Sequence, residues 1–209
     1  MKQVILMADI IGSGTKDSRK LMSDFKSIVL SANKKFDKSL KSPLTITLGD
    51  EFQGVIADVK TSLEIILFIE EEFIRKKLDF KLRFVLVEGI IDTLINNKRA
   101  FEMLGPGLTK ARESLYNLKG SNQRFYVALE DKIISEILNN SLLLLQILIS
   151  QWKIQKDYET VYNLIRYGDY KKVSEVMNKN RSLIWKRAKS LNIESYNAIK
   201  NIIYTIPKL

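Results

Sequence analysis

The chain contains neither cysteine nor histidine among its 209 residues. Without cysteine it can form no disulfide and no thiolate-based zinc or redox site. Without histidine it cannot build a Ser-His-Asp triad, an HExxH metalloprotease site or any imidazole general base. Any chemistry must therefore come from carboxylates or from Lys, Arg, Tyr, Ser and Thr side chains.

Long hydrophobic runs are also missing. The most apolar window, residues 141–149, is far shorter than the roughly 20 residues that a membrane span needs. The first ten residues contain one lysine and an apolar run ending at Asp9, with no small-residue cleavage site of a signal peptide. The hydrophobic fraction of 45% is ordinary for a globular protein, so we expect a soluble, cytoplasmic protein.

Positive charge is concentrated near the C-terminus. The net charge is +10, yet residues 1–130 carry 21 Lys and Arg against 17 Asp and Glu. Residues 151–209 carry 12 against 5, a net of +7 in a much shorter segment. A basic segment favours phosphate-rich partners, although lysine is frequent along the whole chain. The placement of the excess therefore directs attention to the C-terminal segment.

Hydrophobic periodicity predicts a β-α-β-β-α-β order for the first 91 residues, which is the order of a ferredoxin-like unit. In the second helix we expect Glu70, Glu71 and Glu72 on the solvent side. The predicted elements are a strand at 4–7, a helix at 21–36, a strand pair at 44–56 around a Gly49-Asp50 turn, a helix at 61–78 and a strand at 82–91.

The pattern then changes from mixed to helical. We expect a short hairpin near Asn96-Asn97, a helix opening at Gly105-Pro106 and a strand at 125–129, with only helices from residue 131 onward. The fold class predicted is α+β, with a palm domain at 1–130, a connecting helix at 131–150 and an all-α domain at 151–209. The apolar helix at 133–149 is too hydrophobic for a free linker, so it lies between domains or in a dimer interface.

Two aspartates close neighbouring strands of the predicted palm. Asp9 ends the first strand, and Asp50 lies in the turn between the next two. In a ferredoxin-like unit these elements are adjacent, so both carboxylates meet at one end of the sheet. Facing carboxylates are costly without a cation between them, and oxygen ligands suit Mg²⁺ or Mn²⁺. Either aspartate alone is also consistent with a simple turn cap.

The segments "MADIIGS", "TLGDEFQGVI" and "LRFVLVEGII" occur in the order that resembles class III nucleotidyl cyclase domains. "LGDEF" also resembles the GGDEF motif of diguanylate cyclases, which have a related palm. The resemblance covers roughly residues 3–129 and implies a Mg²⁺ or Mn²⁺ site at Asp9, Asp50 and the backbone carbonyl of Ile10. It also implies a nucleotide site, for which the candidates are Gly49, Glu51 and Arg112. Gly12 and Ser13, in the small-residue stretch after the first strand, are candidates to cradle a phosphate with backbone N–H groups, and a simple loop is the alternative for them.

The segment at 104–115 departs from the cyclase pattern. Aligned on Gly105, the position of the transition-state asparagine holds Thr109, and the arginine position holds Glu113. Arg112 is one residue out of register. Retained catalysis is therefore an open question. The start "MADIIGS", followed by Arg19, and the "LGDEFQG" hairpin resemble the SatD family of bacterial acid-tolerance operons over most of the chain.

Residues 173–191 have the spacing of a helix-turn-helix, similar to that of sigma-factor region 4 and resolvases. Val173, Val176 and Met177 form the apolar side of the first helix. Asn178 stands where such turns usually hold glycine, and asparagine also tolerates the left-handed conformation. In the second helix, at 181–191, we expect Leu183, Ile184 and Ala188 to face inward.

The second helix of such a motif lies in the major groove of DNA. A plain helical hairpin packed on the domain is the alternative, but a tryptophan among basic residues favours DNA. The predicted DNA-binding residues are Asn180, Arg181, Ser182, Trp185, Lys186 and Lys189.

The combined prediction is a DNA-binding regulator, expected as a homodimer, whose cyclase-like palm binds a metal and a nucleotide or related phosphate. An active metal-dependent nucleotidyl cyclase or nucleotidyltransferase with a partner-docking tail is the alternative from the enzyme class. A degenerate palm that serves as a dimerisation scaffold is the third.

Overall fold

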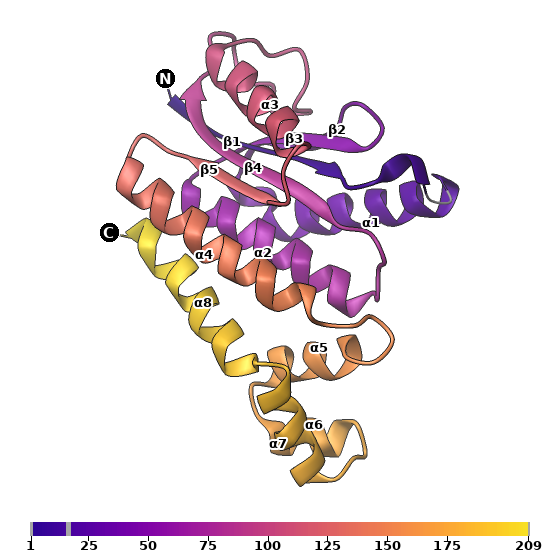
Figure 1. Ribbon diagram of the computed structural model, residues 1–209. Coiled ribbons are helices and arrows are strands. Elements are labelled where there is room, and N and C mark those ends of the chain that lie inside the picture. The colour runs from indigo at the N-terminus through magenta and orange to yellow at the C-terminus, as the bar shows by residue number, and fades with distance from the viewer. Residues whose placement is uncertain (1, 16–17, 209) are drawn as a thin grey trace.

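The computed structural model describes residues 2–15 and 18–208, which fold into one five-stranded sheet covered by helices (Figure 1). The palm comprises β1 (Lys2–Ile10), α1 (Ser18–Phe36), β2 (Leu40–Ile46), β3 (Glu51–Ile56), α2 (Val59–Arg75), β4 (Leu82–Ile90), α3 (Pro106–Leu118) and β5 (Phe125–Ala128). The helices that follow are α4 (Lys132–Ser150), α5 (Tyr158–Tyr167), α6 (Tyr170–Val176), α7 (Arg181–Ser190) and α8 (Ile193–Thr205). Short 3₁₀ turns lie at Ser13–Thr15, Asp37–Ser39 and Ile206–Lys208.

The sheet has the order β2-β3-β1-β4-β5. The first four strands pair antiparallel, and β5 is added parallel to β4. This confirms the predicted ferredoxin-like order, because β1 lies between the β2–β3 pair and β4. Asp9 is thereby flanked by Glu51 on β3 and by Arg83 on β4.

The alternation of side chains along β1 explains why this strand is apolar throughout. Val4, Leu6, Ala8 and Ile10 enter the larger buried cluster on the side of α1 and α2, whereas Ile5 and Met7 enter the cluster under α3. Asp9 continues the second series, so its side chain is directed to the α3 face of the sheet.

α3 lies unusually close to the sheet. A Cβ atom added to Gly89 of β4 would come within 2.4 Å of the Cα of Gly107, and one added to Gly107 would meet Gly89 at 2.7 Å. Only glycine at both positions permits this approach. The close contact fixes α3 over the strands and brings Lys119, which caps the C-terminus of α3, to the end of β1.

α4 covers the outer edge of β5. The Asn139 side chain donates to the Val127 carbonyl and accepts from the Val127 N–H, both at 2.8 Å. Gln146 accepts from the Arg124 N–H at 2.7 Å, and Ser135 accepts from the Leu129 N–H at 2.9 Å. Polar side chains on one face of an apolar helix therefore replace the neighbouring strand that an open edge requires.

The helices after β5 pack on the palm. One buried cluster includes the sheet, α1 and α2 together with residues of α4, α5, α6, α7 and α8. Glu70 and Glu72 are buried at 8% and 9% exposure, and Glu71 accepts hydrogen bonds from Tyr196 and Lys200 of α8. The expectation that these glutamates face solvent was wrong, because the C-terminal helices cover that side of α2.

The segment after β4 differs from expectation. No strand lies between residues 91 and 104, so the predicted hairpin near Asn96-Asn97 is a loop, held by the Asn96 side chain accepting from the Lys98 and Arg99 N–H groups. Among the described residues, α4 alone is long and apolar enough to cross a membrane by length and composition. Of its most apolar 18-residue stretch, 39% is buried. The hydrogen bonds that α4 makes to β5 show that it packs on the sheet.

Candidate functional site

Asp9 is the centre of a charged cluster at the end of the central strands. Its side chain is buried, with 1% exposure, and Arg83 Nη1 donates to both carboxylate oxygens at 3.2 and 3.0 Å. Lys119 Nζ lies 3.4 Å from Asp9 Oδ2 and 3.4 Å from Glu51 Oε1. Two carboxylates and two cations from β1, β3, β4 and the end of α3 thus neutralise one another.

The energetics of this cluster are set by burial. Burial raises the pKa of Asp9 above its ordinary value of 3.8, although Arg83 and Lys119 act in the opposite direction. Burial alone lowers the pKa of Lys119, but the Asp9 and Glu51 carboxylates more than offset this and raise it above its ordinary value. The buried carboxylate therefore depends on both cations to stay ionised.

The predicted meeting of the strand ends is observed, but the side chains of Asp9 and Asp50 take different partners. The Ile10 N–H donates to the Asp50 carbonyl at 2.9 Å, so the two segments touch. The Asp50 carboxylate accepts from the Ser13 hydroxyl at 2.7 Å, and this bond joins two loops in which Gly12 and Gly49 have φ of 69° and 81°. The cross-strand partner of Asp9 is Glu51, since directly opposed residues share a face.

These residues, as arranged, do not present a metal site. Both oxygens of Asp9 are engaged by Arg83, and Lys119 occupies the side toward Glu51. Within residues 2–15 and 18–208 no group of three or more His, Cys, Asp or Glu is placed to hold a metal ion. A divalent cation on Asp9 requires that Lys119 first moves away, because the ammonium and the metal compete for the same oxygen.

Arg112, the predicted nucleotide-binding cation, is exposed on the middle of α3. It lies two helical turns before Lys119, about 10 Å along the axis. Lys119 and Arg83 occupy the cationic positions instead, and sequence reasoning missed both. The available signal for Arg83 was a charge in an otherwise apolar strand, whereas Lys119 looks like any lysine at the end of a helix.

The C-terminal helices α5, α6 and α7 pack against one another. The turn between α6 and α7 contains Asn178 in the left-handed region, with φ of 49°. Asn180 caps α7 by accepting from the Ser182 N–H at 2.8 Å and from the Ser182 hydroxyl at 2.9 Å. The turn therefore lies where the sequence indicated, but Val176, expected on the apolar side of the first helix, is 48% exposed.

α7 is mostly exposed, with Ile184 as its one buried residue. Ser182, Lys186 and Lys189 lie on its exposed side at helical spacing, and Lys189 pairs with Glu194 at 2.9 Å. Leu183, expected to face inward, is 48% exposed. Arg187 takes the inward direction instead, because it forms an ion pair with Asp157 at the start of α5.

Trp185 lies at the edge of the exposed side of α7. It is 47% exposed and lines an open hollow of about 320 Å³ with Tyr170 and Ile193. Its indole is therefore accessible, and Lys189 lines the same hollow. Arg181 begins the helix with a side chain 64% exposed, 3.9 Å from Glu175.

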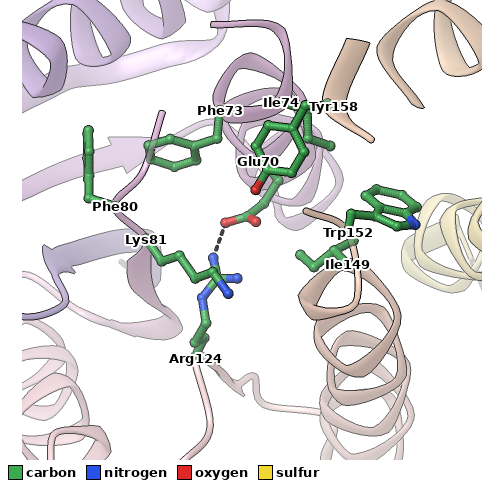
Figure 2. A pocket seen from close by; sticks show the side chains of 9 residues that line it. All are labelled: Glu70, Phe73, Ile74, Phe80, Lys81, Arg124, Ile149, Trp152 and Tyr158. Carbon is green, nitrogen blue, oxygen red and sulfur yellow. Dashed lines mark hydrogen bonds and ion pairs between the residues drawn. The ribbon is translucent and has the colours of Figure 1, made fainter. Parts of the chain in front are cut away.

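A second charged group is sealed between α2, β5 and the helices that follow (Figure 2). Arg124 forms an ion pair with Glu70 and donates from Nε to the Leu82 carbonyl at 3.0 Å. Tyr158 and Trp152 close the site, whose cavity of about 20 Å³ has room for a water molecule. It is too small for a nucleotide, and burial, with Glu70 nearby, raises the pKa of the Tyr158 hydroxyl.

The fold and the strand-end cluster define an α+β palm protein with a mutually neutralised charged site and an attached helical region. The chain belongs to the SatD family, whose model matches residues 3–206. No curated protein matches it.

Solved structures of cyclase domains are similar to part of the chain. A bacterial light-regulated adenylyl cyclase is 15% identical with a TM-score of 0.41, over 60% of this chain and 74% of that chain. The dimeric guanylyl cyclase domain of the RhoGC fusion protein from the aquatic fungus Blastocladiella emersonii is 14% identical with a TM-score of 0.43, over 60% and 78%. The guanylyl cyclase Cya2 is 10% identical with a TM-score of 0.39, over 61% and 74%.

Proposed function

We propose that this protein is a DNA-binding regulator whose palm binds a nucleotide or another phosphate ligand. The observation that carries the proposal is α7. It follows a left-handed turn at Asn178, is capped by Asn180, and buries only Ile184. A helix held at one face with the other face free has the geometry of a recognition helix.

The charge of this region supports a nucleic-acid partner. Lys186 and Lys189 lie on the exposed side of α7, and residues 151–209 have a net charge of +7. Cations on such a face bind phosphates and release counterions, so affinity falls steeply with salt. Arg181, at the start of the helix, is better placed to reach base edges.

The palm provides the proposed ligand site at the strand ends. Lys119 is 43% exposed and bridges Asp9 and Glu51, and the Gly12–Ser13 loop lies beside the Asp50 turn. An anion that withdraws Lys119 from this cluster would leave Asp9 with Arg83 alone. The proposed Mg²⁺ or Mn²⁺ site through Asp9, Ile10 and Asp50 depends on the same movement of Lys119.

Two positions in α3 argue against an active cyclase. Thr109 and Glu113 stand at the positions that the resemblance assigns to catalytic asparagine and arginine. Arg112 lies two turns away from the charged cluster. We therefore propose ligand binding without turnover.

DNA binding is tested with the full-length chain, because removing residues beyond 150 would expose the buried cluster shared with the palm. By fluorescence anisotropy with duplex DNA, Lys186→Ala and Lys189→Ala should each weaken binding several-fold for all sequences and lower the salt slope by about 1. Arg181→Ala should reduce the preference among sequences. Lys110→Ala, which removes an exposed palm lysine, is the matched control and should change nothing. An equal loss in the control would show that α7 has no special role.

A further inference from the structure

The exposed face of α4 carries apolar side chains at coiled-coil spacing. Ile133, Ile137, Leu144 and Ile147 are 72%, 41%, 55% and 51% exposed. With Asn140 they form one line along the helix, at successive intervals of four, three, four and three residues. These are the intervals of the seam between two paired helices.

The fold of the single chain does not account for this line. Leu138, Leu142 and Leu145 fill the core, and Asn139 and Gln146 bond the edge of β5. All contacts between α4 and the rest of the palm are thus made by its other faces. The exposed apolar line is left unpartnered.

The uncharged face of α4 suits a second copy of the chain as its partner. Two copies with a net charge of +10 repel each other, and a contact through uncharged side chains adds no further like-charge repulsion. Residues 137–150 contain no charged side chain. A helix that lies on a lipid surface carries Lys and Arg along its polar face, whereas the one basic residue of α4 is Lys132 at its start.

The line is also centred on its one polar member. Asn140 lies seven residues from both Ile133 and Ile147. In an antiparallel pair related by a two-fold axis, Asn140 meets Asn140 of the second copy, and Ile133 meets Ile147 of the second copy. A single polar Asn in an otherwise apolar seam specifies register, and the dipoles of two antiparallel helices attract.

We propose that α4 is the interface of a two-fold homodimer in which the two helices cross antiparallel at Asn140. The seam is about 21 Å long. α8, which packs along α4 (Figure 1), exposes the further apolar residue Ile202. This proposal is independent of DNA binding, since it concerns a different helix and needs no ligand.

Light scattering of the full-length chain tests the interface. We expect a dimer for the wild type at about 100 µM, and a monomer for Leu144→Lys with an unchanged circular dichroism spectrum. Leu94→Lys, at a loop residue that is 94% exposed, is the matched control and should remain dimeric. If Leu144→Lys misfolds, Ile147→Glu at the end of the helix replaces it. A monomeric wild type, or a dimer that survives both α4 substitutions, overturns the proposal, as does a monomer that floats with anionic lipid vesicles.

Crosslinking tests the direction of the helices, since the chain has no native cysteine. A mixture of Ile133→Cys and Ile147→Cys chains, oxidised together, should form a disulfide-linked dimer of the two variants, and neither should link to itself. Leu94→Cys should stay unlinked. Self-linking of Ile133→Cys would show parallel helices and overturn the antiparallel arrangement.

Discussion

Two carboxylate–arginine pairs in this molecule differ in their access to solvent. The Asp9–Arg83 pair lies at the strand ends and continues to the surface through Lys119, which is 43% exposed. The Glu70–Arg124 pair lies between α2 and β5, with 9% and 7% of the side chains exposed, closed in by Trp152 and Tyr158 (Figure 2). Similar chemistry thus occurs once in an open and once in a sealed environment.

This difference in solvent access distinguishes a pair that a ligand can reach from a pair that only joins parts of the fold. The sealed pair joins α2 to the residue before β5, Trp152 and Tyr158 from the following segments cover it, and its cavity holds nothing larger than water. The open pair can exchange one cation, Lys119, for another partner. We therefore expect the sealed pair to control stability and the open pair to control ligand binding.

The largest expected effect is at the sealed pair. Arg124→Leu removes the ion-pair partner of the buried Glu70, leaving only the more distant charge of Lys81, and removes the bond to the Leu82 carbonyl. It should lower the free energy of unfolding by about 3–5 kcal/mol, measured by urea denaturation at pH 7. Adding Glu70→Gln to this variant should restore part of the loss. A loss below about 1 kcal/mol would contradict the assignment of this pair as the structural link.

The next effect is at the open pair. Arg83→Leu should cost less, about 2 kcal/mol, because Lys119 still offsets the charge of Asp9. The double variant with Asp9→Asn should be more stable than Arg83→Leu alone, since no buried carboxylate then lacks its partner. Equal losses for Arg83→Leu and Arg124→Leu would mean that the two sites do not differ as proposed.

The pH dependence of stability sharpens the comparison further. The pKa of Asp9 in the folded protein lies above its ordinary value of 3.8 because of burial. Its stabilising contribution is therefore complete below pH 3.8 and is lost as the pH rises through the folded-state pKa. Relative to Asp9→Asn, the wild type should lose stability from pH 4 upward, as seen in urea titrations at several pH values. If the stability of the wild type instead rises relative to Asp9→Asn over this pH range, the pKa of Asp9 in the folded protein is lowered and not raised.

The smallest expected effect concerns the metal. Lys119→Met removes one of the two cations beside Asp9 Oδ2, so it should raise Mn²⁺ affinity several-fold in calorimetry. Asp9→Asn and Asp50→Asn should abolish that gain, and Lys110→Met serves as the control. Unchanged Mn²⁺ affinity in both aspartate variants would rule out the predicted metal site.

Local patterns predicted the elements better than the contacts between them. The apolar run before Asp9 gave β1, and the Gly49-Asp50 turn gave the β2–β3 connection. The left-handed conformation expected at Asn178 is present in the turn between α6 and α7. Each rests on the backbone preferences of neighbouring residues, which the sequence displays directly.

The errors and omissions arose where distant segments meet. The glutamates of α2 were expected in solvent because the helix was considered alone, whereas α8 and Arg124 cover them. Leu183 was expected to face inward, whereas Arg187 takes that direction because the buried Asp157 carboxylate is its partner. Asparagine and serine side chains on α4 had no evident purpose until β5 was seen to lack a neighbour.

The sequence by itself determined the strand order and the end of the sheet where the charged residues gather, because alternation and turn chemistry are local. Only the tertiary structure decided which charges meet there. Asp9 faces Glu51 because opposed residues of paired strands share a face, and Lys119 reaches them because two glycines let α3 approach the sheet. Neither relation is encoded by spacing along the chain, since each joins residues more than forty positions apart.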